Sequence, residues 1–121
     1  MDVRKSIDES VIELKNDLVE GQSFNLPTEK QYERAIKFYQ LIDKKFKSGL
    51  EIISSWQGTV IFEWDVNTTK HNQLAILIYD KDELGYAYHI NGKSNHGSFS
   101  YDYGNTIPEL IIEMMEKLNA N

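Results

Sequence analysis

The sequence predicts one α+β domain over residues 1–121, with helices packed on one face of an antiparallel sheet. Apolar residues recur at helical spacing in the first part of the chain and again at its end. Between these parts they alternate with a period of two, as in strands, and turn-forming residues interrupt them at intervals that suit hairpins. We therefore expect two helices, five strands in a meander and one last helix, the order ααβββββα.

The first helix is predicted to start at Ser6, because Ser6 and Glu9 have the spacing of a capping box. Gly21 supplies the left-handed residue that would end it. The predicted apolar stripe consists of Ile7, Val11, Leu14 and Leu18. The remaining surface of this helix is acidic and includes Glu13 and Asp17, which makes it a candidate contact surface.

The second helix is predicted from Thr28 and Gln31, which repeat the capping spacing, and it should close at Ser48-Gly49. Its predicted apolar side consists of Tyr32, Ala35, Ile36, Tyr39, Ile42 and Phe46. The opposite side is basic, so the two N-terminal helices carry opposite charge.

The strands are predicted near residues 50 to 56, 59 to 66, 73 to 80, 85 to 90 and 97 to 103. Thr106 with Glu109 makes a third capping box, with Pro108 in the first turn, and predicts the last helix. Its apolar face consists of Ile107, Leu110, Ile111, Met114 and Leu118. One shared core is predicted for Ile36, Tyr39, Phe62, Trp64, Leu74, Ile76, Leu110 and Met114.

The composition excludes several classes of site. The chain of 121 residues has no cysteine, which removes disulfides, iron–sulfur clusters and thiolate zinc sites. Its formal net charge of −6 is opposite in sign to that of a typical nucleic-acid binder. The longest apolar run, Leu74 to Tyr79, is too short to cross a bilayer, and the charged opening lacks the apolar core of a signal peptide. We expect a cytoplasmic protein without membrane or nucleic-acid partners.

Aromatic residues gather in the last two predicted strands, where Tyr86, Tyr88, Phe99, Tyr101 and Tyr103 alternate. If these strands pair, the rings share one face of the sheet. Core packing under the helices explains this pattern, and so does a partner-binding surface, because Tyr is enriched at interface hot spots. A platform for nucleic acid fits worse, since the sheet half is acidic. The predicted partner-binding site consists of Tyr86, Tyr88, Tyr101, Tyr103, Asp80, Asp82, Glu83 and Asp102.

Two histidines, His89 and His96, flank the predicted last hairpin, with Asp102 nearby in the sequence. Across paired strands they could approach each other and bind a metal or transfer protons. However, hairpin histidines are usually solvated, and the spacing matches no zinc motif. Gly92-Lys93-Ser94 lacks the upstream glycine and the following helix of a phosphate loop, so we interpret it as a turn.

The remaining carboxylates are interpreted as surface groups. Asp80, Asp82 and Glu83 join two predicted strands, whereas a calcium loop of the EF-hand type joins two helices. Glu63 alternates with aromatic neighbours and should point away from them, into solvent or toward the basic helix. We therefore predict no catalytic residue, no metal and no cofactor.

Five segments of the chain form a pattern that extends over about residues 12 to 118: Leu26-Pro27-Thr28-Glu29, Ala35-Ile36-Lys37-Phe38, Trp56-Gln57-Gly58-Thr59-Val60-Ile61-Phe62-Glu63-Trp64, His96-Gly97 and Ile107-Pro108-Glu109-Leu110. In order, they are a Pro-Thr helix start, an Ala-Ile helix, a Gly-x-x-x-x-Glu-Trp strand, a hairpin and an Ile-Pro-Glu helix. This pattern resembles that of a family of short, uncharacterised bacterial and phage-type proteins. Where the family places Trp-Asp-Gly, this chain has Val19-Glu20-Gly21. The resemblance implies the same element order and a bacterial or phage source, but no activity.

The leading functional hypothesis is a non-enzymatic, acidic protein-binding module of the antitoxin, immunity or phage anti-defence inhibitor type. Such a module acts by occupying a basic site on a protein partner. The alternative is a small-molecule or nucleotide-binding protein, or an enzyme, that uses the His and Tyr residues of strands four and five. A structural subunit of a larger assembly is a third hypothesis. Gene neighbourhood would separate the first two, because a toxin or nuclease gene alongside favours binding and a metabolic operon favours the alternative.

Overall fold

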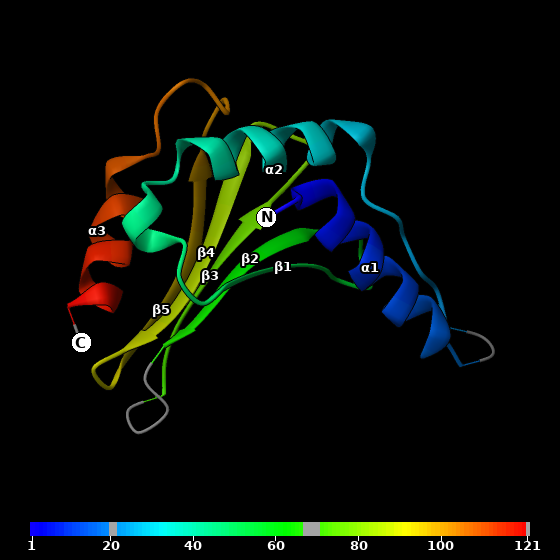
Figure 1. Ribbon diagram of the computed structural model, residues 1–121, viewed down its shortest axis with the longest axis horizontal. Helices are drawn as coiled ribbons and strands as arrows, with labels where there is room; N and C mark the ends of the chain where they lie inside the picture. Colours follow the sequence, from blue (N-terminus) through cyan, green and yellow to red (C-terminus); the bar gives the residue numbers. More distant parts are fainter. Residues whose placement is uncertain (20–21, 67–70, 121) are drawn as a thin grey trace.

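The computed structural model describes residues 1–19, 22–66 and 71–120, and its architecture is the predicted ααβββββα layout (Figure 1). Three helices, one short 3-10 helix and five strands make up the described chain. Their bounds are α1 Val3–Asn16, α2 Glu29–Leu41, η1 Lys44–Phe46, β1 Leu50–Ser54, β2 Val60–Val66, β3 Asn72–Ile78, β4 Glu83–Ile90, β5 Lys93–Ser100 and α3 Glu109–Asn119.

The five strands form one antiparallel meander in the order β1-β2-β3-β4-β5. Alternate residues point to opposite faces of such a sheet. In Figure 1 the helices lie on one face, where the register aligns Phe62 with Ile76 and Ile76 with Tyr86. The other face, which we call the open face, carries Ile61 beside Leu77, and Figure 1 shows no helix of the described chain lying over it.

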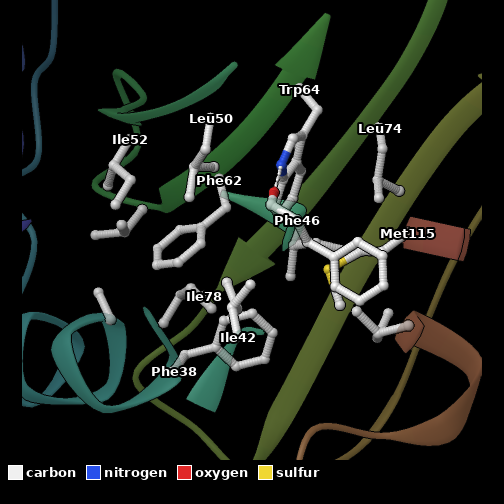
Figure 2. Close-up of a cluster of buried hydrophobic side chains, with 14 of the residues drawn as sticks. Phe38, Ile42, Phe46, Leu50, Ile52, Phe62, Trp64, Leu74, Ile78 and Met115 are labelled. Carbon is white, nitrogen blue, oxygen red and sulfur yellow. Dashed lines mark hydrogen bonds between the residues drawn. The ribbon is translucent and has the colours of Figure 1, made fainter. Parts of the chain in front are cut away.

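The core lies between the sheet and the helices (Figure 2). Phe38 of α2 meets Phe62 of β2 edge to face, with 5.4 Å between the ring centroids. The Trp64 indole N–H donates to the Phe46 carbonyl at 2.7 Å, which ties η1 to the sheet. Of the predicted core, Phe62, Trp64, Leu74, Ile76 and Met114 are buried, and Ile36 and Tyr39 are half-buried. The prediction for Leu110 is wrong, because this side chain is 42% exposed.

The first helix starts earlier than predicted. Asp2 is its N-cap, and the Asp2 carboxylate accepts the backbone N–H of Lys5 at 3.1 Å. The capping box expected at Ser6 is therefore wrong, because the acidic cap lies one turn before it and brings Val3 into the buried stripe. The helix ends at Asn16, so Leu18 is exposed, and the expected end at Gly21 lies outside the described residues.

The second helix confirms its capping box. The Thr28 N–H donates to Gln31 Oε1 at 2.8 Å, and the Gln31 N–H donates to Thr28 Oγ1 at 3.3 Å. The helix is shorter than predicted, because the backbone becomes extended at Ile42 before η1 begins. Its buried face consists of Gln31, Ala35 and Phe38. The predicted stripe was rotated toward Tyr32 and Tyr39, which are half-buried.

The last hairpin and the last helix also differ from prediction. β4 and β5 are joined by the two-residue turn Asn91-Gly92, and both residues have positive φ, as a tight hairpin turn requires. The fifth strand therefore begins at Lys93 instead of 97. Pro108 is the N-cap of α3 and no side chain caps this helix, so the predicted Thr106–Glu109 capping box is wrong.

Candidate functional site

A groove of about 600 Å³ crosses the open face of the sheet. Its position follows from the strand register, which aligns Glu51, Glu63, Ala75 and Ala87 in one row across β1 to β4. The alanine side chains end at Cβ, so they leave a depression in the surface of the sheet between the longer side chains around them. The lining residues are Gly49, Glu51, Glu63, Trp64, Asp65, Gln73, Leu74, Ala75, Ala87, Tyr88 and His89. We call this feature the acidic groove.

Three carboxylates give the acidic groove its charge. Glu51, Glu63 and Asp65 are exposed, and none of them forms an ion pair within the part of the chain that the structure describes. Glu51 and Glu63 are direct cross-strand neighbours, and like charges at such positions repel each other. A cation placed between them would relieve this repulsion. The exposure of Glu63 confirms the prediction that it points into solvent. The alternative prediction, that it points toward the basic helix α2, is wrong, because α2 covers the other face of the sheet.

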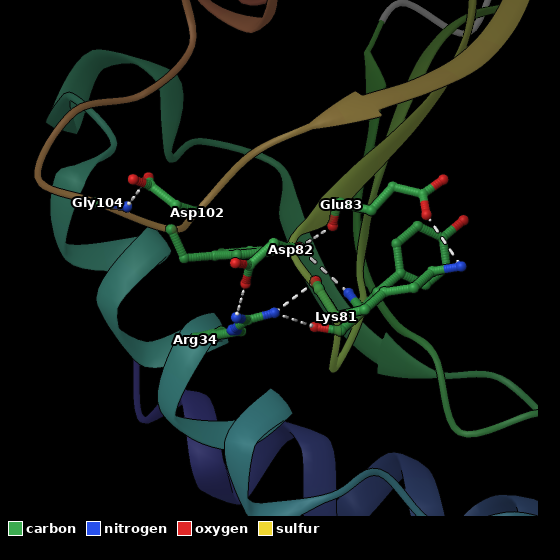
Figure 3. Close-up of polar contacts among 8 residues, drawn as sticks. Arg34, Lys81, Asp82, Glu83, Asp102 and Gly104 are labelled. Carbon is green, nitrogen blue, oxygen red and sulfur yellow. Dashed lines mark hydrogen bonds and ion pairs between the residues drawn. The ribbon is translucent and has the colours of Figure 1, made fainter.

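His89 of β4 and His96 of β5 also lie on the open face, on the side away from β1. His89 lines the acidic groove, and its Nδ1 is 2.6 Å from the hydroxyl oxygen of Ser94 across the hairpin. His96 is opposite Ala87 and is thus the diagonal neighbour of His89. Asp102 does not join them, since it lies beyond the end of β5 and its carboxylate accepts the Gly104 N–H at 2.9 Å (Figure 3).

The four tyrosines of the predicted partner-binding site lie on the helix side of the sheet or beyond its end. Tyr86 and Tyr88 are half-buried against the core and stack with 6.5 Å between centroids. The Tyr101 hydroxyl donates to the Thr106 carbonyl at 2.7 Å, and its ring lies near Phe38. Tyr103 is only 6% exposed. Core packing therefore accounts for much of this aromatic cluster, and Tyr103 offers almost no surface for contact.

Two of the carboxylates of the predicted partner-binding site, Asp82 and Glu83, form ion pairs within the molecule (Figure 3). Arg34 of α2 forms an ion pair with Asp82, donates to the Lys81 carbonyl and lies over the Tyr103 ring at 4.3 Å from its centroid. Glu83 pairs with Lys81 at 2.9 Å. Asp82 and Glu83 thus have internal partners, which leaves less free charge at this turn than the sequence indicated.

Tyr103 holds the β3–β4 turn in place. Its hydroxyl donates to the Glu83 carbonyl at 2.7 Å and accepts the Tyr79 N–H at 3.2 Å. Burial raises the pKa of Tyr103 from 10.0 to about 12. Folding therefore favours the neutral phenol, and this stabilisation is complete below pH 10 and is lost as the pH rises toward 12.

We expect Tyr103→Phe to lower stability by about 1 to 2 kcal/mol at neutral pH, because two hydrogen bonds disappear. The variant should also lose less stability than the parent between pH 10 and 12, since Tyr103 no longer ionises. Urea unfolding of both proteins across this range measures the difference. Burial also raises the pKa of Tyr32 to about 12, but Tyr32 is present in both proteins and cancels. Parallel pH profiles would contradict the assignment.

Comparison with known proteins adds no functional assignment, because no family model, curated protein or solved structure matches the chain. The resemblance to bacterial and phage-type proteins stays a prediction from the sequence. Within residues 1–19, 22–66 and 71–120, no helix is long and apolar enough to span a membrane. Over the same residues, no three His, Asp or Glu side chains converge so as to hold a metal ion.

Proposed function

We propose that this chain is a non-enzymatic binding protein that acts by occupying a basic surface of a protein partner. The observation that carries the proposal is the acidic groove, where Glu51, Glu63 and Asp65 have no ion-pair partner among the described residues. Lysine or arginine side chains of a partner would supply the missing charge. The class that this activity fits is that of antitoxins, immunity proteins and phage-encoded inhibitors of host defence.

The proposal moves the contact surface from the predicted tyrosine site to the open face. A sheet face without a covering helix offers backbone rigidity, and rigid presentation reduces the entropy lost on binding. The net charge of −6 would speed association with a basic partner, and this effect should weaken with salt. Asp80 and Asp102, which are exposed, would add to the long-range field rather than to the contact.

A second candidate function is supported by the size of the groove. A volume of about 600 Å³ falls within the range of small-molecule sites, roughly 300 to 1,000 Å³. His89 lines one side of it and carboxylates line the other, so a positively charged small molecule fits this surface better than a nucleotide, whose phosphates the carboxylates would repel. Saturation of the protein by a dialysable ligand, measured by calorimetry, would favour this alternative.

Neutralising the groove should abolish partner capture. In a pull-down from a bacterial extract, the double variant Glu63→Gln and Asp65→Asn should lose the protein that the parent retains. Affinity should fall about tenfold to hundredfold, or roughly 1.4 to 2.8 kcal/mol, because each change removes one charged contact. The matched control is Glu13→Gln with Asp17→Asn on α1, which changes the net charge equally and should keep the partner.

Two outcomes would contradict this proposal. If the α1 control loses the partner and the groove variant keeps it, the interface lies on the acidic helix. If folded Tyr88→Ala and Tyr101→Ala variants lose it instead, the aromatic side is the contact surface. Inhibition of a purified partner should also be stoichiometric, so sustained inhibition of a large target excess would show turnover and would exclude action by occupancy.

A further inference from the structure

We propose that two copies of this chain associate through the outer edge of β5, joining their sheets into one continuous antiparallel sheet. This inference is independent of the proposed function. It rests on the difference between the two edges of the sheet, on the charge of β5 and on the symmetry of strand pairing.

The outer edge of β5 presents unpaired backbone groups. β5 pairs with β4 without interruption from Lys93 to Ser100. The Tyr101 N–H donates to the Asp82 carbonyl at 3.2 Å, which fixes the odd-numbered residues as those that bond to β4. The even-numbered residues of β5 therefore direct their N–H and C=O groups outward: Ser94, His96, Ser98 and Ser100. Among these, the His96 N–H is accepted by its neighbour Asn95 at 2.9 Å.

The opposite edge, at β1, is occupied from within the molecule. The Ser55 N–H donates to the Thr59 carbonyl at 2.9 Å, so the even-numbered residues of β1 point outward. Two of these outward N–H groups have acceptors, since Ser54 donates to Ser10 Oγ of α1 at 2.9 Å and Leu50 donates to the Lys47 carbonyl at 3.3 Å. Figure 1 shows α1 beside β1. Only β5 thus offers a long edge without such cover among the described strands.

The charge of β5 favours a second copy over a basic partner. Residues 93–100 contain no Asp or Glu and one lysine, in a chain whose net charge is −6. Two acidic copies repel each other over most of their surfaces, but not at this strand. A basic segment would find no carboxylate on β5 itself. The strand also lacks proline, a device that keeps exposed edges from pairing, and its one charged side chain, Lys93, lies at its first residue.

A two-fold axis perpendicular to the sheet pairs β5 antiparallel with its own copy, which is the geometry of the rest of the sheet. This symmetry places both open faces on the same side. The dimer would therefore present two acidic grooves in one direction, an arrangement that favours a partner with repeated basic sites.

Sedimentation equilibrium of the untagged protein over a range of concentrations tests the inference. We expect a monomer–dimer equilibrium whose dimer fraction falls in Ser98→Pro, because proline removes an outward N–H that has no acceptor among the described residues of the same copy. His96→Lys, which keeps every N–H and adds one positive charge to each side of the seam, should also weaken the dimer. Gln40→Lys on α2 adds the same charge away from the edge and should leave the equilibrium unchanged.

Each outcome bears on the inference. A parent protein that stays monomeric up to its solubility limit would overturn it, as would a dimer that persists in both Ser98→Pro and His96→Lys. If Ser98→Pro does not fold, as judged by circular dichroism, His96→Lys decides the result. Loss of the dimer in Gln40→Lys as well would show that any added charge disrupts association, and would place the interface elsewhere.

Discussion

Replacing Phe62 by Ala is expected to lower the free energy of unfolding by about 3 to 5 kcal/mol. Phe62 is fully buried in the centre of the sheet, and its ring meets Phe38 edge to face. Truncation removes the transfer free energy of the ring and leaves a cavity, because β2 is held on both sides by β1 and β3 and cannot collapse into the space. Chemical denaturation at constant pH measures the loss.

The neighbouring residue in β2 gives the control. Ile61 lies on the open face and is half-buried, so Ile61→Ala should cost about 1 kcal/mol or less. The comparison separates burial under the helices from a general effect of shortening a side chain in this strand. Equal losses for Phe62→Ala and Ile61→Ala would mean that the helices do not cover the Phe62 face.

The start of a helix was predicted correctly where the capping motif and the apolar stripe after it agree. Thr28 and Gln31 fixed the start of α2, because both partners of the capping box and a following apolar stripe agree. At the first helix the capping-box spacing of Ser6 and Glu9 predicted a start one turn too late, because Asp2 is the N-cap. A capping box is a short motif, and at this helix it is outweighed by the Asp2 cap, which extends the buried stripe to Val3.

The buried face of α2 shows a different limit. Gln31 is polar, and apolar periodicity therefore assigned it to the surface. It is buried because its Nε2 donates to the carbonyls of Gly58 and Ile78, at 2.8 and 3.2 Å. Both acceptors lie far away in the sequence. No local pattern indicates a long-range hydrogen bond of this kind, so the predicted stripe was rotated toward Tyr32.

The acidic groove could be predicted only in part. The alternation in β2 placed Glu63 and Asp65 on one face, which the structure confirms. The groove itself depends on the alignment of Glu51 with Glu63 and of Ala75 with Ala87, and a shift of one residue in any pairing would remove it. Register depends on the exact turn residues, and the turn before β5 was predicted several residues too long, since the strand begins at Lys93. The alternation of the tyrosines in the last two predicted strands can be recognised without knowing the register, so the sequence predicted these residues, and not the groove, as the contact surface.

The substitution Gly58→Ala is also expected to lower the free energy of unfolding strongly. Gly58 has φ +82°, where an alanine costs about 1 to 2 kcal/mol. A Cβ there would also lie 2.9 Å from the Leu26 carbonyl oxygen and 3.1 Å from that of Asn25. Both contacts are with backbone, and the Asn25 N–H donates to the Trp56 carbonyl at 3.0 Å, so this segment cannot move away without breaking its own bond.

Gly49 separates these two causes. Its φ of +76° is nearly the same, but a Cβ would meet nothing within 4 Å. Gly49→Ala should therefore cost only the conformational part, about 1 to 2 kcal/mol, whereas Gly58→Ala should lose roughly 1 to 3 kcal/mol more through overpacking. The additional loss should include weakened docking of α2, because the Gly58 carbonyl accepts the Gln31 side chain. Thermal and urea unfolding of both variants measure the difference, and equal losses would show that the close approach of Leu26 to Gly58 does not exist in solution.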